Sequence, residues 1–185
     1  MKKIVALCSL LVLICSTLIT GCSSLLAPPD KAYTITIDGV DIVVGKTTVG
    51  EFYGTNFILD AEEGQQLEKD MYYPTVFFYD ENEESRGWID IATEKDCVLE
   101  DAIIAKVEFD EDYDLASIAD RVELEGVKLS DLTLEKAKEI VKRSTDIENG
   151  ISCPSKNYSI VITFDEDGSI LSFKTSKKYS VDWNS

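Results

Sequence analysis

Carboxylates are the side chains best placed to do chemistry here, because the chain has 35 Asp and Glu residues against 18 Lys and Arg and has no histidine. Residues 110–114 (DEDYD) put carboxylates at positions 1, 3 and 5 of a calcium-binding loop. The sixth position is Leu115, where the turn needs glycine, and the twelfth is Arg121, where a bidentate glutamate belongs. The run therefore predicts a solvated loop, and we expect no metal site.

The sequence offers little for catalysis. Without histidine it lacks the commonest general base and the commonest metal ligand. Neither Cys97 nor Cys153 has an imidazole to activate it. A carboxylate pair for glycoside cleavage stays open among so many acids, but no pattern selects a pair. We expect no catalytic residue and no cofactor, and a hydrolase is the least favoured class.

The first residues have the layout of an export signal. Lys2 and Lys3 precede an apolar run that ends at Ile19-Thr20-Gly21-Cys22. These four residues resemble the lipobox of bacterial lipoproteins. The resemblance implies that residues 1–21 are a signal peptide and that the Cys22 thiol carries a diacylglyceryl group. It also implies a protein anchored in the cell membrane by this lipid, on the extracytoplasmic side.

The alternative for this segment is an uncleaved transmembrane anchor. A helical span needs about 20 apolar residues. The run over residues 4–20 is shorter and contains serine and threonine. The lipoprotein interpretation is therefore favoured. A location outside the cytoplasm also permits a disulfide between Cys97 and Cys153. The alternative is two buried free thiols, which behave as small hydrophobic groups.

The charge excludes one class of partner. The net charge is −17, and the leader contains two of the basic residues and no acid. Such a surface repels nucleic acid phosphates and anionic lipid headgroups. We expect no nucleic acid partner. The acidity serves solubility, or it steers a basic partner.

Residues 33–44 (YTITIDGVDIVV) predict a hairpin around Asp38-Gly39. A two-residue turn pairs Ile35 with Ile42 and places the apolar side chains on one face. Thr48, with a glutamate three residues later, then fits the capping box of a short helix. The pattern returns in residues 122–129, where Glu125-Gly126 is the turn. Thr133 follows as the N-cap of a helix to about Ser144.

The remaining apolar runs alternate as strands do. They cover residues 75–79, 88–92, 97–109, 158–164 and 169–173, and residues 97–109 form either one long strand or two short ones.

The order of acidic-Gly turn, threonine cap, helix and strands thus occurs twice, by duplication or by chance. It resembles the small modules of the SmpA/OmlA outer-membrane lipoproteins and of the β-lactamase-inhibitor proteins, although the Gly-x-Pro step after the helix is missing. The resemblance implies an α+β fold in which an antiparallel sheet carries helices on one face. Two related modules, residues 33–110 and 111–185, would follow a tether over residues 22–32.

One surface is a candidate for binding. Alternation puts Trp88 on the strand face that carries Asp90, opposite Ile89, with Phe77 and Tyr79 on the neighbouring strand. Such aromatics form either a second packed layer or a contact surface. We therefore predict a non-enzymatic binding module whose protein partner touches Phe77, Tyr79 and Trp88. The alternative is an inhibitor- or sensor-type module specific for one protein.

Overall fold

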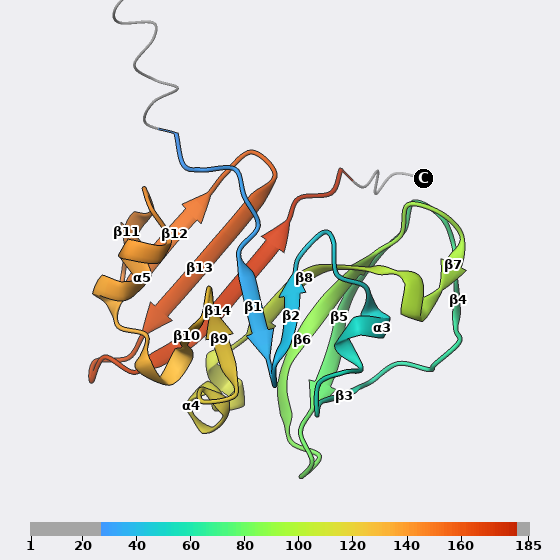
Figure 1. The fold of residues 1–185 in the computed structure, drawn as a ribbon, viewed down its shortest axis with the longest axis horizontal. Coiled ribbons are helices and arrows are strands. Elements are labelled where there is room, and N and C mark those ends of the chain that lie inside the picture. The colour runs from blue at the N-terminus through green and yellow to red at the C-terminus, as the bar shows by residue number, and fades with distance from the viewer. Residues whose placement is uncertain (1–26, 181–185) are drawn as a thin grey trace, which may run out of the picture.

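The computed structural model describes residues 27–180, which form an α+β fold dominated by antiparallel strands (Figure 1). The strands belong to an eight-stranded sheet, a four-stranded sheet and a two-stranded ribbon. In Figure 1 the four-stranded sheet lies in front of the eight-stranded one, and the core fills the space between them.

The eight-stranded sheet has the order β11-β12-β13-β14-β8-β6-β5-β3, and every neighbour is antiparallel. Its strands are β3 (Ile58–Leu59), β5 (Tyr72–Tyr79), β6 (Ser85–Ala92), β8 (Ile103–Phe109), β11 (Thr145–Ile147), β12 (Gly150–Pro154), β13 (Tyr158–Phe164) and β14 (Ile170–Lys177). The ribbon consists of β4 (Gln66–Leu67) and β7 (Cys97–Val98). The predicted run over residues 97–109 is thus divided into two strands, β7 and β8.

The four-stranded sheet unites the two predicted hairpins in the order β10-β9-β1-β2. Its strands are β1 (Thr34–Ile37), β2 (Val40–Val43), β9 (Val122–Leu124) and β10 (Val127–Lys128). The predicted pairing of Ile35 with Ile42 is confirmed, and both side chains are buried. Asp38 and Gly39 have φ of 49° and 83°, the left-handed values that a two-residue hairpin turn requires.

Arg121 ties the two hairpins together. Its Nε and Nη2 donate to the Asp38 carboxylate at 2.9 and 2.8 Å, and its guanidinium lies 4.4 Å from the centre of the Phe57 ring. The hydrogen bonds from Arg121 lower the pKa of Asp38 from its ordinary value. This contact joins segments that are far apart in the sequence.

Short helices follow the hairpins. They are α3 (Val49–Phe52), α4 (Leu115–Ile118) and α5 (Leu134–Ile140), with the 3-10 helices η1 (Leu99–Asp101), η2 (Glu111–Tyr113) and η3 (Leu129–Asp131). The predicted capping box at Thr48 is present, and Thr133 caps α5 by accepting from the Lys136 amide. The prediction that α5 extends to Ser144 is wrong. Val141 leaves helical geometry, and Arg143 has φ of 64°, because the chain must reverse there into β11.

The two faces of the eight-stranded sheet differ in chemistry. Toward the core, a row of rings joins Phe52, Phe78, Phe109 and Phe173, with centroids 5.4 to 6.3 Å apart. All four side chains are fully buried. The alternate residues of β8 and β14 include charged side chains that are only half-buried. We call this second side the outer face.

Candidate functional site

Three aromatic rings meet on the outer face. Phe77 in β5 lies directly opposite Trp88 in β6, with ring centroids 6.1 Å apart and planes at 67°. Tyr113 closes the group at 5.9 Å from Trp88 and 6.2 Å from Phe77. Edge-to-face contacts of this kind are favourable for aromatic pairs. The sequence did not indicate Tyr113, because η2 brings it back over the sheet after β8 has ended.

Two further side chains extend this group. Tyr79 pairs with Ile58 of β3, while the next pair, Phe78 with Leu59, is buried in the core. Alternation therefore puts Tyr79 and Ile58 on the outer face, where Ile58 is 61% exposed. We call Ile58, Phe77, Tyr79, Trp88 and Tyr113 the Trp88 patch. Ile58 could have been found only by knowing that β3 pairs with β5.

Trp88 itself is half-buried. Lys106 Nζ lies 5.3 Å from the centre of its ring, within the range of a cation–π contact. The indole N–H is shielded and has no hydrogen-bond partner among residues 27–180. An unsatisfied donor costs about 1–3 kcal/mol. The rings of Phe77 and Tyr113 and the Lys106 ammonium therefore stabilise the position of Trp88, and the unpaired indole N–H offsets part of this stabilisation.

A ladder of charges runs beside the patch. Lys106 Nζ lies 3.0 Å from Asp90 and 3.1 Å from Glu108, and Lys174 Nζ lies 3.2 Å from Glu108. The Tyr72 hydroxyl donates to Asp90 at 2.6 Å, and burial followed by this hydrogen bond raises the pKa of Tyr72. Two carboxylates balance two ammonium groups. The ladder is therefore a neutral polar surface within an acidic protein.

A backbone distortion supports this ladder. Thr75 has φ of 61°, an uncommon value for a β-branched residue, in the irregular part of β5. Its amide donates to Asp90 at 3.0 Å. Strain of this kind costs about 1–3 kcal/mol and needs such compensation. The Thr75 amide and the Tyr72 hydroxyl thus donate to the same carboxylate, one to each oxygen of Asp90.

The β5–β6 turn positions the other end of the patch. Arg86 Nε donates to Asp80 at 2.8 Å, and both side chains are more than nine-tenths buried. Burial alone would raise the pKa of the Asp80 carboxyl. The hydrogen bonds from Arg86 and from the amides of Asn82 and Glu84 outweigh burial and lower it. This buried pair fixes the turn between Tyr79 and Ser85.

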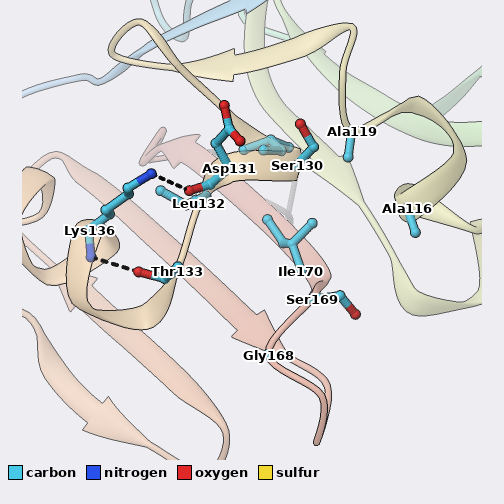
Figure 2. Close-up of a pocket in the computed structure, with 11 residues that line it drawn as sticks. Ala116, Ala119, Ser130, Asp131, Leu132, Thr133, Lys136, Gly168, Ser169 and Ile170 are labelled. Carbon is cyan, nitrogen blue, oxygen red and sulfur yellow. Dashed lines mark hydrogen bonds between the residues drawn. The ribbon is translucent and has the colours of Figure 1, made fainter.

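Several hollows open on residues 27–180, one of them beside the ladder and another beside α5. One, of about 370 Å³, continues from the ladder and is lined by Tyr72, Asp90, Lys106, Lys174, Ser176, Lys177, Lys178 and Tyr179. The other, of about 500 Å³, lies between α4, α5 and the start of β14 (Figure 2). In this second hollow Lys136 Nζ donates to the Asp131 carbonyl at 2.8 Å, so this ammonium already has a hydrogen-bond partner in the main chain. Ala116, Ala119 and Ile170 give this second hollow an apolar wall (Figure 2).

Cys97 and Cys153 are free thiols in the structure. Cys153 lies buried in β12, and Cys97 in β7 pairs with Leu67 of β4. Burial raises the pKa of both thiols. Cys22 lies outside the described residues. Between residues 27 and 180 no group of Cys, Asp and Glu has an arrangement that could hold a metal ion. In the same range no helix has the length and apolarity to cross a bilayer.

Comparison of the chain with protein-family models, with curated proteins and with solved structures gave no match.

Proposed function

We propose that this protein is an extracytoplasmic lipoprotein, held on the cell membrane by lipid on Cys22, and that it is a non-enzymatic binding module. Its protein partner contacts the Trp88 patch. The observation that carries this proposal is the ring cluster of Trp88, Phe77 and Tyr113 on the outer face. The anchor rests on the lipobox Ile19-Thr20-Gly21-Cys22.

The energetics favour the rings over the acidic loops as the contact. Exposed ion pairs contribute about 0–1 kcal/mol and are screened by salt. Aromatic anchors that become desolvated often cost 2 kcal/mol or more when truncated. The acids of a chain with net charge −17 steer a basic partner toward the protein. The ladder beside Trp88 has no net charge, so it adds little electrostatic repulsion when that partner packs against the rings.

We further propose that residues 33–110 and 111–185 are two related modules. The strand order supports this. Read outward from the β8–β14 junction, one half of the large sheet is β8-β6-β5-β3 and the other is β14-β13-β12-β11. The small sheet has the same arrangement, because β9 followed by β10 lies on one side of the β1–β9 junction and β1 followed by β2 lies on the other. Such an order is expected when two copies pack about a local two-fold axis.

The same proposal places the helices on one face of the large sheet. It is supported by the positions of α3 and α5 in Figure 1, where both are drawn in front of that sheet. With α3 and α5 on the core side, the outer face is left for a partner.

The anchor is tested by metabolic labelling with a palmitate analogue. Wild-type protein and a Cys97→Ala control should incorporate the label, and Cys22→Ala should not. Equal labelling of wild type and Cys22→Ala would refute the anchor.

The contact is tested by crosslinking on intact membranes. Trp88→Ala should weaken partner capture about 30-fold, the equivalent of about 2 kcal/mol. Tyr53→Ala removes a half-buried aromatic from the end of α3 and should capture normally. Equal capture by the two variants would exclude the patch. One stoichiometric partner would favour an inhibitor- or sensor-type module specific for that protein, and several partners a general binding module.

A further inference from the structure

The chain enters the domain at the top of Figure 1, beside the turn between β12 and β13. The first described residues are fastened to this end. The Asp30 carboxylate accepts hydrogen bonds from Ser155 Oγ at 2.8 Å, from the Asn157 amide at 2.7 Å and from the Asn157 side chain at 2.6 Å. Arg143 Nη1 donates to the Ala27 carbonyl at 2.8 Å. The segment expected to be a tether is therefore docked from Ala27 onward, at Ala27 on Arg143 and at Asp30 on the β12–β13 turn.

Several cations surround this docking point. The hydrogen bonds from the Asn157 amide and from Ser155 lower the pKa of Asp30, and the charge of Lys156, which lies between these two residues, adds to the effect. Lys178 Nζ donates to the Ser155 carbonyl at 2.7 Å. Lys177 pairs with Tyr158 at the start of β13. We call Lys142, Arg143, Lys156, Lys177 and Lys178 the basic end.

The basic end holds five of the 18 basic residues of a chain whose net charge is −17. Lys142 and Lys156 are exposed, and neither forms a salt bridge within the described part of the chain. By contrast, Lys31 nearby is paired with Glu125 at 3.5 Å. The acidic residues dominate the rest of the protein, so its charge is distributed unevenly. An anionic surface would attract this end and repel the remainder.

We propose that the basic end lies against the anionic lipid headgroups of the membrane. This inference rests on the proposed lipid on Cys22. Five residue steps separate Cys22 from Ala27, and a fully extended chain spans at most about 3.6 Å per residue, or roughly 18 Å in all. The anchor therefore keeps the basic end close to the bilayer. Cations act within a Debye length of about 8 Å at physiological salt.

The orientation bears on the Trp88 patch. In Figure 1 the connection between β5 and β6 is at the bottom of the view, opposite the point where the chain enters. Phe77 and Trp88 lie in the half of these strands next to that connection, because Tyr79 pairs with Ser85 beside it. With the basic end on the membrane, the patch is presented away from the bilayer, where an extracytoplasmic partner can reach it.

The test uses the lipid-free mature chain, residues 22–185 with Cys22→Ser, in co-sedimentation with vesicles. The wild-type surface should bind vesicles of equimolar phosphatidylcholine and phosphatidylglycerol, and should not bind pure phosphatidylcholine. Each basic residue near an anionic membrane contributes about a fivefold gain in binding. The double variant Lys142→Gln/Lys156→Gln should therefore bind about 25-fold more weakly.

The control removes the same charge elsewhere. Lys69 and Lys128 are exposed lysines remote in sequence from the basic end, with side chains 61% and 47% exposed. Lys69→Gln/Lys128→Gln should bind within about twofold of the parent chain. A circular dichroism melt verifies that each variant is folded.

Three results would overturn the inference. They are equal binding to the two kinds of vesicle, equal loss in the two double variants, and binding to a polyglutamate peptide with none to vesicles, which would indicate an acidic protein as the partner. Because the chain in this assay has no lipid, the result is independent of the Cys22 labelling experiment. A failed anchor and a failed basic end are thus distinguishable.

Discussion

Trp88→Ala separates a surface tryptophan from a core one by its effect on folding stability. Truncating a fully buried aromatic costs about 3–5 kcal/mol. Trp88 is only half-buried, and its ring makes edge contacts with Phe77 and Tyr113 that are worth about 0.5–1.5 kcal/mol each. An unsatisfied buried donor costs about 1–3 kcal/mol, and removing the indole N–H recovers part of that free energy. The net loss should be about 1–2 kcal/mol.

Phe78→Ala is the matched comparison, because Phe78 is next to Phe77 on the same strand but faces the core. It is fully buried and contacts the rings of Phe52, Phe57 and Phe109. Its truncation should cost about 3–5 kcal/mol. Urea unfolding, followed by far-UV circular dichroism, gives both free energies under the same two-state treatment.

Trp88→Phe adds an internal check. It keeps an aromatic ring between Phe77 and Tyr113 and removes the N–H that has no partner. We expect a stability within about 1 kcal/mol of wild type. If Trp88→Ala is as damaging as Phe78→Ala, Trp88 belongs to the core, and the Trp88 patch is not a contact surface.

Three further predictions concern stability and the thiols. Arg121→Gln should cost about 2 kcal/mol at pH 7. The pKa of Asp38 is lowered in the folded state, so its pairing with Arg121 stabilises the fold fully only above the unfolded pKa of about 4. The difference in unfolding free energy between wild type and Arg121→Gln should therefore shrink as the pH falls below about 4. A difference that stays constant with pH would contradict the pairing. Cys97 and Cys153 should be slow to alkylate at neutral pH, since burial raises the pKa of both. Intact mass without reductant should equal the reduced mass, and a loss of two hydrogens would reveal a disulfide. Gly150→Ala should cost about 2 kcal/mol or more in thermal unfolding, because its Cβ would lie 2.1 Å from a backbone carbonyl of β13; an unchanged melting temperature would rule out this crowding.

Much of the local structure followed from the sequence alone. Asp38-Gly39 determined the register of the first hairpin, since a two-residue turn with both φ values positive admits one pairing of its strands. Thr48 and Thr133 determined where two helices begin, because the hydroxyl of each N-cap accepts a hydrogen bond from an amide that the first turn of the helix leaves free. These signals act over a few residues, so they survive without knowledge of the fold.

The end of α5, and the choice between one strand and two for residues 97–109, depended on tertiary structure. The helix stops at Ile140 because β11 must pair with β12, which has no local signal. Likewise β7 pairs with β4, a partner about 30 residues earlier in the chain, and η1 turns the chain between β7 and β8.

The candidate site also has one part that the sequence predicts and another that only the fold reveals. Alternation within one strand placed Trp88 and Phe77 away from the core, and the proposal of lipid on Cys22 needs only the four adjacent residues Ile19-Thr20-Gly21-Cys22. Ile58 and Tyr113 joined the patch only through strand order and a 3-10 turn. The basic end likewise needed the fold, since Asp30 and Asn157 are 127 residues apart. Periodicity reports which side of a strand faces inward, whereas which surfaces become neighbours depends on long-range packing that no local pattern encodes.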